Sequence, residues 1–256
     1  MTDAALPPVL VRDAVRHELV RRDLEVLRTS RLTSTIVRVT LGGPELEGFV
    51  ALGPEDHVRL FFPSSGEERV SRDYTPAAHR PTRNELDIDF VVHEDAGPAS
   101  RFAATAQPGD RLIVAGPRGS RLAPTGVRKF VLLADEASLP ALGRWIAAVP
   151  SDAEVFAFVQ SDHADVLDYP LPGGDRVAVT RIATGSEAAL VALGGPDLEP
   201  AYVWAAGEAT ALIPVRRQLR RELGLPKDRA KVDGYWRKGV AGLDHHAPLD
   251  PENPDE

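Results

Sequence analysis

The sequence predicts two consecutive domains of different fold class: an antiparallel β-barrel of six strands, then an α/β domain built on a parallel sheet. Two observations lead to this prediction. The first half consists of short alternating segments separated by turn residues, whereas the second half alternates apolar runs with stretches of helical spacing. At 256 residues the chain has room for two medium-sized domains. We place the first domain at residues 1–125, the second at residues 126–242, and a disordered acidic tail at residues 243–256.

The strands of the predicted barrel follow a leader. Residues 1–22 carry mixed charges, and we expect them to be loose, with helix only near Val11 to Leu19. Stretches rich in β-branched residues then indicate a hairpin and four further strands, at residues 24–41, 57–62, 68–76, 85–92 and 111–115. Pro76 leaves one point open, because the residue before a proline is restricted and the strand over residues 68–76 can break there.

The second half contains longer apolar runs. Residues 130–134 are apolar throughout, which is typical of a strand covered on both faces. We expect further strands at residues 154–160, 176–180, 201–206 and 230–235, and helices at residues 137–148, 187–193 and 210–223. Strands that alternate with helices imply a parallel sheet. The tail from Asp244 is rich in Pro, Asp and Glu, a composition that favours disorder.

The amino-acid composition excludes several classes of functional site and partner. The chain has no cysteine, which excludes disulfides, thiolate metal sites and cysteine nucleophiles, so any redox chemistry must come from a bound cofactor. The net charge of −8 argues against nucleic-acid binding, although 30 Lys and Arg residues leave room for a local basic pocket. No apolar segment has the length of a signal peptide or of a membrane span, so we expect a cytoplasmic protein with no membrane contact.

One stretch suits a flavin nucleotide. Arg72, Tyr74 and Thr75 supply a guanidinium for a phosphate, a phenol ring for stacking and a hydroxyl for a ring nitrogen. On a regular strand, Arg72 and Tyr74 lie on one face. Residues 97–100, Gly-Pro-Ala-Ser, then open a predicted helix just after the strand at residues 85–92. The free N–H groups and positive dipole end of such a helix suit a phosphate.

These motifs carry a family resemblance. Arg-x-Tyr-Thr followed by Gly-Pro-Ala-Ser resembles the flavin signature of the ferredoxin–NADP reductase superfamily. With Glu85 to Phe90, Gly116 to Ser120 and Ala206 to Thr210 included, the chain resembles one branch, the siderophore-interacting proteins, which are FAD-dependent ferric-siderophore reductases. The similarity runs from Leu24 to Gly239. It implies that the barrel binds FAD and that the α/β domain binds NAD(P)H.

The resemblance also implies roles for single residues on the flavin side. Arg72 would hold the pyrophosphate, Tyr74 would stack on the isoalloxazine, and Thr75 would bond near its N5. The helix start at Gly97, with the N–H groups of Ala99 and Ser100, would bind the pyrophosphate. The strand face of Asp89, Val91 and His93 would line the flavin, with His93 near the adenine or ribose; the alternative for His93 is a surface histidine.

The nicotinamide side has two candidate turns. Asp135, Glu136 and Ala137 lie between a buried strand and a helix, where open parallel sheets bind ligands. The equivalent turn after a later strand contains Gly207, Glu208, Ala209 and Thr210. Plain packing at a strand end is the alternative for both. Asp162 and Arg181 favour NADH and NADPH respectively, so the donor stays open.

Arg118, Arg237 and Lys238 are the candidates for substrate binding. Ferric siderophores are commonly anionic, and a cationic pocket beside the flavin would attract them. The alternative is three solvated charges. Tyr235 and Trp236 are a second candidate for covering the flavin, and we expect the pair His245-His246 to be inert rather than a metal site.

The sequence therefore predicts a monomeric ferric-siderophore reductase that passes electrons from NADPH or NADH through FAD to Fe(III) and so releases Fe(II). Fe(II) binds hard oxygen chelators less tightly than Fe(III), which is why reduction frees the iron. No side-chain acid or nucleophile is needed. One alternative is a flavin reductase or diaphorase that serves another acceptor, such as a ferredoxin. A siderophore carrier without turnover is another, and bound flavin would count against it. The siderophore itself is not specified.

Overall fold

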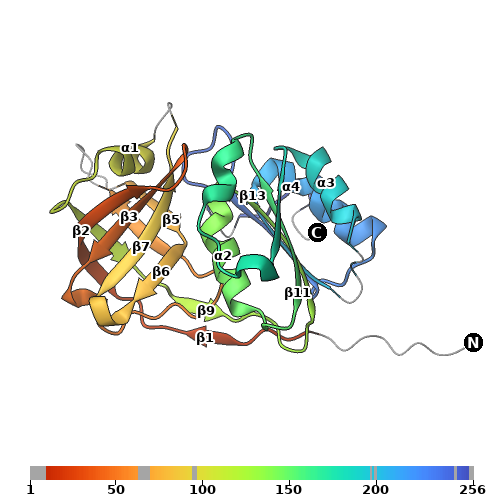
Figure 1. The fold of residues 1–256 in the computed structure, drawn as a ribbon, viewed down its shortest axis with the longest axis horizontal. Coiled ribbons are helices and arrows are strands. Elements are labelled where there is room, and N and C mark those ends of the chain that lie inside the picture. The colour runs from red at the N-terminus through yellow and green to blue at the C-terminus, as the bar shows by residue number, and fades with distance from the viewer. Residues whose placement is uncertain are drawn as a thin grey trace, which may run out of the picture.

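The computed structural model describes residues 10–62, 70–93, 97–196, 198, 201–244 and 247–253. Figure 1 shows two parts side by side, a curled antiparallel sheet formed by the first half of the chain and a parallel sheet with helices formed by the second. The predicted pair of fold classes is therefore confirmed. The pair His245-His246 and the last three residues lie outside the described residues.

Within the described residues, the curled sheet has seven strands. Every neighbouring pair is antiparallel, and the order across the sheet is β5 (Val70–Tyr74), β4 (Val58–Phe62), β8 (Arg111–Ala115), β2 (Arg21–Arg31), β3 (Ile36–Gly42), β7 (Glu85–Val91) and β6 (Pro76–Arg80). Helix α1 (Pro98–Thr105) packs on the core of this sheet through Ala99 and Ala103. The core itself is formed by alternate residues of the strands, such as Leu86, Ile88 and Phe90.

The seventh strand arises at Pro76. The segment expected as one strand is divided after Tyr74, so that β5 pairs with β4 at one edge of the sheet and β6 pairs with β7 at the other. Thr75 is the one residue between them. The restricted conformation before a proline explains the break. The chain therefore crosses between the two open edges of the barrel at Thr75.

The described part of the leader is extended and not loose. Strand β1 (Ala14–Arg16) pairs antiparallel with β9 (Gly119–Arg121), and no helix forms near Val11 to Leu19. Gly119 allows this contact, because a Cβ there would lie 2.7 Å from the carbonyl oxygen of Val15. Residues 14–16 and 119–121 lie side by side beneath the barrel in Figure 1. The helix prediction was wrong because the pairing partner is more than a hundred residues away.

In the part of the chain that the structure describes, the second sheet has five parallel strands. Their order is β12 (Ala178–Ile182), β11 (Glu154–Gln160), β10 (Lys129–Asp135), β13 (Tyr202–Glu208) and β14 (Ala230–Trp236). The helices are α2 (Leu139–Ala148), α3 (Ser186–Gly194) and α4 (Ala209–Arg217), which continues into the π-helical turn η6 (Gln218–Glu222). The 3-10 turns are η1 (Pro44–Leu46), η2 (Pro81–Arg83), η3 (Glu136–Ser138), η4 (Ala164–Asp168) and η5 (Gly174–Arg176).

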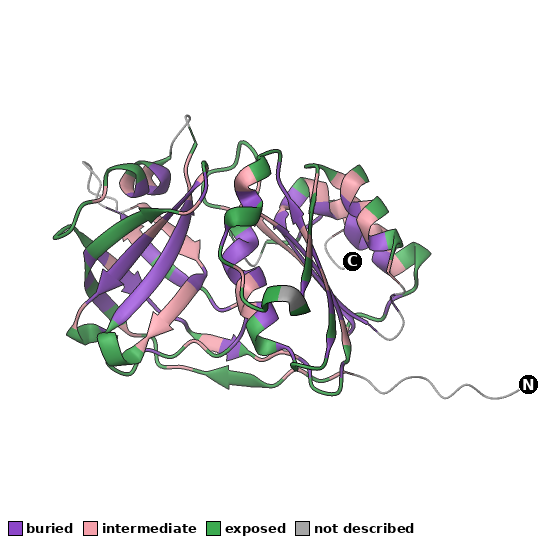
Figure 2. Cartoon of the chain, in the orientation of Figure 1, coloured by how far each residue is buried: buried purple, intermediate pink, exposed green. Residues whose placement is uncertain are grey.

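Both faces of the parallel sheet are covered. Phe130, Leu132 and Ala134 of β10 pack in one cluster with α2, while Val131 and Leu133 pack in another with α3 and α4. Figure 2 shows the burial that results along the central strands. The continuous apolar run in the sequence is thus explained by two buried faces.

The barrel and the α/β part share polar contacts as well as apolar ones. Ile36 of β3 belongs to the α2-side cluster. Arg144 of α2 donates to the carbonyl oxygen of Gly53 at 2.6 Å and to that of Ala51 at 3.0 Å. The tail also packs in part, since Leu249 is buried and Asp250 forms an ion pair with Arg217 of α4 at 2.7 Å. Leu249 and Asp250 thus lie against the α4 side of the sheet, and disorder of the tail stays a prediction from composition.

Candidate functional site

The carboxyl ends of β10, β13 and β14 bring three predicted segments together. Asp135 ends β10, Glu208 ends β13 and Trp236 ends β14. The indole Nε1 of Trp236 donates to Asp135 Oδ2 at 2.6 Å, and the backbone N–H of Lys238 donates to Glu208 Oε1 at 3.1 Å. Carboxyl ends of parallel strands are where open sheets bind ligands. The two predicted nicotinamide turns and the segment that begins at Trp236 thus lie together at this end of the sheet.

The carboxylate of Asp135 is held by hydrogen bonds to both of its oxygens. Its Oδ1 accepts from the backbone N–H of Ser138 at 3.0 Å, which caps η3. Burial raises the pKa of Asp135, while hydrogen bonds from Trp236 and Ser138 act in the opposite direction. Both carboxylate oxygens are therefore used within the protein. Ala137 of the same turn is exposed.

Gly207 makes room for that carboxylate. Its φ is +155°, and a Cβ at this position would lie 2.7 Å from Asp135 Cγ. The pairing of β13 with β14 shifts register between Gly207 and Glu208. Glu208 then caps α4, since its Oε2 accepts from the N–H of Ala211 at 2.7 Å. Ala209 is buried and Thr210 is exposed on the first turn of that helix.

Glu136 is held across the boundary between the two parts. Its Oε2 accepts from Thr35 Oγ1 of the barrel side at 2.6 Å, and its Oε1 accepts from Ser161 Oγ at 2.5 Å. The predicted contact of Glu136 with nicotinamide thus competes with two hydroxyl donors. Neither donor is near Glu136 in the sequence, so motif reading gave no signal for them.

Arg72 and Tyr74, two of the predicted flavin-side residues, lie on the edge strand β5. Arg72 Nη1 donates to the carbonyl oxygen of Ser71 at 2.7 Å, and its guanidinium would be 3.2 Å from a Cβ on Gly242. The ring of Tyr74 packs on Phe90 with centroids 4.6 Å apart. Burial raises the pKa of Tyr74, so its phenol stays neutral.

Thr75 connects this edge to the other sheet. Its side chain shares a hydrogen bond with Tyr235 of β14, and burial raises the pKa of that tyrosine well above its usual range. Tyr235 therefore places the last strand against the residue predicted to lie near the flavin N5. The sequence offered Tyr235 only as a candidate cover.

The start of α1 fits a phosphate. Gly97 is the N-cap with extended backbone, Pro98 occupies the first turn, and no side chain of the described residues caps the helix. Backbone N–H groups at such a helix start suit a phosphate. The backbone N–H of His93 donates to Ser100 Oγ at 3.3 Å, which fixes α1 to the end of β7. An uncapped helix start, together with the guanidinium of Arg72, is a donor set that fits the pyrophosphate of FAD.

On the strand face that is predicted to line the flavin, the carboxylate of Asp89 is already bound by other residues of the protein. Asp89 is bound by Arg38 at 2.7 and 2.8 Å and accepts from Tyr169 at 2.6 Å. Its oxygens are thus engaged between the two parts of the molecule. Val91 is half-buried and His93 is exposed beyond it.

The three predicted substrate cations are not joined to one another. Arg118 is exposed, and its carbonyl oxygen accepts from the N–H of His17. Arg237 Nη2 donates to the carbonyl oxygen of Leu249 at 2.9 Å. Lys238, the next residue, is exposed. Among the described residues, no hydrogen bond or ion pair joins Arg118 to Arg237 or Lys238. A basic pocket made by all three stays a prediction.

Comparison with known proteins places the chain in a family. Residues 127–239 match the model for the siderophore-interacting protein, and residues 25–71 and 65–121 match the siderophore-interacting FAD-binding domain. An NADPH-dependent ferric-chelate reductase of Escherichia coli is 34% identical over 87% of this chain and 95% of its own length. The chain belongs to the siderophore-interacting protein family. This confirms the resemblance seen in the sequence.

Two further similar proteins, one a solved structure and one a curated relative, support this assignment. The crystal structure of a siderophore utilization protein from T. fusca matches with a TM-score of 0.84 and 39% identity, covering 93% of this chain and 100% of that one. The ferric vibriobactin reductase ViuB of Vibrio cholerae is 29% identical over 85% of this chain and 90% of its own length. The fold is therefore shared over nearly the whole chain, and the FAD-binding domain over residues 25–121.

No helix in the described ranges is both long and apolar enough to cross a bilayer. In that same part of the chain, no group of three or more His, Asp or Glu side chains is arranged to hold a metal ion.

Proposed function

We propose that this protein reduces Fe(III) held in a siderophore, with electrons from NAD(P)H delivered through FAD, and so releases Fe(II) in the cytoplasm. The observation that carries the proposal is the near full-length match to a relative named for NADPH-dependent ferric-chelate reduction. FAD, when bound, would supply the redox chemistry, because it can accept two electrons at once and release them one at a time.

The residues of the chain have binding and positioning roles in this proposal. Arg72 and the N–H groups at Gly97, Ala99 and Ser100 would hold the pyrophosphate of FAD, Tyr74 would contact the ring system, and Thr75 would lie at its N5 edge. The face of Val91 and His93 would complete the flavin site. Asp89 would hold this strand in position, since its carboxylate is bound by Arg38 and Tyr169.

The nicotinamide would enter at the carboxyl ends of the parallel strands. The turn at Asp135, Glu136 and Ala137 and the turn from Gly207 to Thr210 would form its walls. The hydrogen bond between Trp236 and Asp135 joins the end of β14 to the first of these turns. We further propose that NADPH is the donor and that Arg181 would bind its 2′-phosphate. In the structure, the guanidinium of Arg181 donates to the carbonyl oxygen of Ser161 at 3.0 Å.

Arg118, Arg237 and Lys238 would attract the anionic chelate to the open edge of the flavin. Lys238 is the best placed of the three, because its backbone is bound to Glu208 at the nicotinamide turn. We infer that the protein acts as a monomer, since both cofactor sites would lie within one chain. A sedimentation mass of one chain would support this, and a stable dimer would contradict it.

An anaerobic titration tests the proposal. Protein purified without added flavin is scanned in the visible range, mixed with NADPH or NADH, and then given a ferric siderophore with a ferrous trap. Loss of flavin absorbance, followed by its return in step with Fe(II), is the expected result. Flavin that is bleached but ignores the chelate would favour another acceptor, such as a ferredoxin. Flavin reduced by ferredoxin and by neither nicotinamide would change the donor.

A further inference from the structure

One arginine of the α/β half donates to the barrel from the helix that follows the predicted nicotinamide turn. Arg144 lies in α2, and α2 begins just after the turn at residues 135–137. Its guanidinium donates to the carbonyl oxygen of Gly53 at 2.6 Å and to that of Ala51 at 3.0 Å. Both acceptors lie between β3 and β4 of the barrel. Arg144 therefore bridges the two halves from the nicotinamide side.

Thr75, the residue that would lie at the flavin N5, has contacts with the α/β half on its own side chain and on the next residue. Its side chain shares a hydrogen bond with Tyr235 of β14. The carbonyl oxygen of Pro76 accepts from Nη1 of Arg144 at 3.4 Å. Thr75 is 7% exposed and joins β5 to β6. The position of this barrel edge thus depends on β14 and on α2.

The barrel loop that Arg144 binds is itself held by hydrogen bonds. Asp56 Oδ2 accepts from the backbone N–H of Gly53 at 3.0 Å and from Ser120 Oγ at 2.5 Å. Ser120 Oγ in turn accepts from the backbone N–H of Leu52 at 3.0 Å. Asp56 and Ser120 are each 4% exposed. The carbonyl oxygens of the loop are therefore fixed in place for the guanidinium.

An arginine is a costly residue at a contact of this kind. The side chain of Arg144 is 15% exposed, and burial lowers its pKa, while the charge of Asp56 at 3.8 Å acts in the opposite direction. Carbonyl oxygens compensate a buried charge only in part. An apolar side chain would pack α2 on the barrel without this cost, but it forms no directional bonds. A planar guanidinium fixes the orientation of its acceptors as well as their distance.

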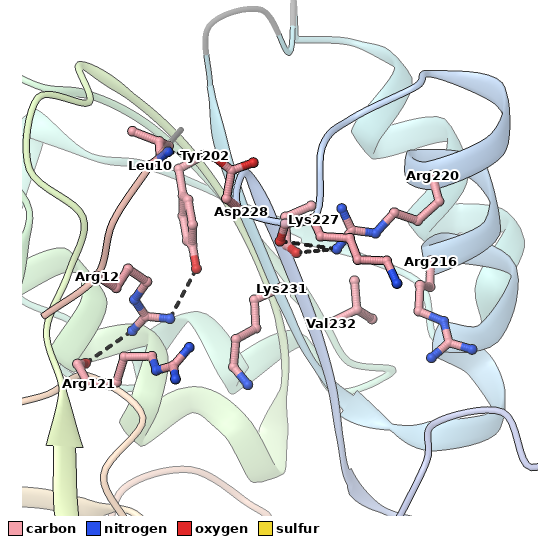
Figure 3. A pocket seen from close by; sticks show the side chains of 11 residues that line it. Leu10, Arg12, Arg121, Tyr202, Arg216, Arg220, Lys227, Asp228, Lys231 and Val232 are labelled. Atoms are coloured by element: carbon pink, nitrogen blue, oxygen red, sulfur yellow. Dashed lines mark hydrogen bonds between the residues drawn. The ribbon is translucent and has the colours of Figure 1, made fainter. Parts of the chain in front are cut away.

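The same loop is also held by Arg12, through contacts that do not involve Arg144. Figure 3 shows Arg12 donating to the hydroxyl of Tyr202 and to the carbonyl oxygen of Arg121, at 3.0 and 3.1 Å. Arg12 also forms an ion pair with Glu55 at 3.0 Å. The two halves therefore keep a second joint when Arg144 is changed, so variants at Arg144 should still fold.

We propose that Arg144 is a positioning residue for the proposed reaction: it fixes the barrel edge at Thr75 relative to the nicotinamide turn that precedes α2. This inference rests on the proposed function, in which a hydride, with its two electrons, leaves the nicotinamide, which is oxidised, and reduces the flavin. Arg144 would act through the loop at Gly53 and through Pro76, and not by contact with either reactant. A misplacement of about 1 Å can slow such a step by about 100-fold, so the orientation of the two halves controls the rate.

A distance measurement on the full chain, saturated with FAD, tests the orientation directly. The chain has no cysteine, so Arg83→Cys on the barrel and Glu187→Cys on α3, both exposed positions, accept two spin labels specifically. We expect a wider or displaced distribution of label distances in Arg144→Gln than in the parent protein. Arg144→Lys keeps the charge but not the fork of donors, so its distribution should lie between the two. The lysine variant carries the test if the glutamine variant does not fold.

Arg176→Gln is the matched control. Arg176 also donates to backbone carbonyl oxygens, those of Pro150 and Ile146, but both acceptors belong to the α/β half. This variant should therefore keep the distance distribution of the parent protein. An unchanged distribution in both Arg144 variants would overturn the proposal, as would an equal change in Arg176→Gln.

Anaerobic stopped-flow reduction of the bound flavin gives the second readout. At saturating NADPH or NADH, the limiting rate should fall by about tenfold or more in Arg144→Gln, whereas the Kd for FAD should change little. A merely structural role would lower the melting temperature and leave the limiting rate of the folded protein unchanged. Altered distances with an unchanged limiting rate would therefore overturn the proposal.

The parent protein separates this inference from the proposed function. A parent flavin that neither nicotinamide reduces would contradict the proposed function and, with it, the role of Arg144. A parent flavin that is reduced, with variants equal to the parent in rate and in label distances, would contradict the role of Arg144 alone.

Discussion

The phenol oxygen of Tyr169 donates a hydrogen bond of 2.6 Å to Oδ2 of Asp89, and this bond joins the α/β part to the barrel. Both residues are buried, at 5% and 6% exposure. Burial and the negative charge of Asp89 raise the pKa of Tyr169 well above its usual range, so the phenol remains a donor. Arg38 supplies the countercharge to the same carboxylate. The residue predicted to line the flavin is thus also part of the contact between the two halves.

Tyr169→Phe should destabilise the protein by about 1.5–3 kcal/mol, because it removes a buried hydrogen bond to a charged group. Urea unfolding measures this change. The same substitution in an Asp89→Asn background should cost less, since the neutral amide is a weaker acceptor. Equal costs in both backgrounds would show that the bond to Asp89 is not the source of the effect.

Glu85 should make the barrel sensitive to acid. Hydrogen bonds from Arg28 and Arg80 lower the pKa of Glu85 to about 2 from 4.5. A carboxylate whose pKa is lower in the folded state binds fewer protons there than in the unfolded chain. Its stabilising contribution is therefore complete above pH 4.5 and is lost as the pH falls towards 2.

The comparison of Glu85→Gln with the parent protein isolates this effect. The variant should be less stable at neutral pH, and the gap in melting temperature should close between pH 4.5 and 2. Asp110→Asn, which changes an exposed turn residue outside this ion-pair group, serves as the control. A gap that stays constant down to pH 2 would contradict the assignment.

The sequence predicts the strands well because their patterns are local. Leu86, Ile88 and Phe90 alternate with charged residues and face the barrel core, as period-two alternation requires. The run from Phe130 to Ala134 is apolar throughout and is covered on both sides. In each case the burial of a residue follows from its own neighbours in the chain.

The candidate site is predicted less fully because its contacts are long-range. Glu136 and Thr35 are 101 residues apart, and Trp236 and Asp135 are also 101 residues apart. No spacing rule reports such pairs. The turns of the nicotinamide side could be located from strand ends, whereas the partners that orient their carboxylates could not.

Gly207→Ala should damage the site through its backbone. The φ of +155° disfavours any Cβ, and that Cβ would also meet the carboxylate of Asp135 at 2.7 Å. Displacing Asp135 would weaken the bond to Trp236. We expect a loss of stability of about 1–3 kcal/mol from strain alone, with the clash adding to it. Gly185→Ala, with φ of +104° and nothing within 4 Å of its Cβ, measures the strain without the clash. Equal losses for the two variants would contradict the role of the Asp135 contact.

Arg72→Ala should lose FAD and keep its fold. The side chain is half-buried, and within the described ranges its guanidinium forms one hydrogen bond, to the carbonyl oxygen of its neighbour Ser71, so its removal should cost the fold little. Loss of charge-assisted hydrogen bonds to the pyrophosphate should weaken FAD binding by about 10- to 150-fold. Flavin content after purification and FAD titration give the readout. Arg59→Ala, on the neighbouring strand, removes an arginine that is paired with Asp73 and should retain FAD. Full flavin occupancy in Arg72→Ala would rule out the assigned role.

Reversal of charge at Arg118 and Lys238 should raise the KM for anionic ferric siderophores. Both side chains are exposed, and Lys238 follows the strand end that holds Trp236 against Asp135. With both changed to Glu, repulsion replaces attraction, and we expect KM to rise by about tenfold while kcat changes little, because uniform binding is what is lost. The effect should shrink at high salt. Arg128→Glu reverses an exposed charge at the far end of β10 and should leave KM unchanged. An unchanged KM in the double variant, or an equal rise for a neutral ferric chelate, would place the substrate cations elsewhere.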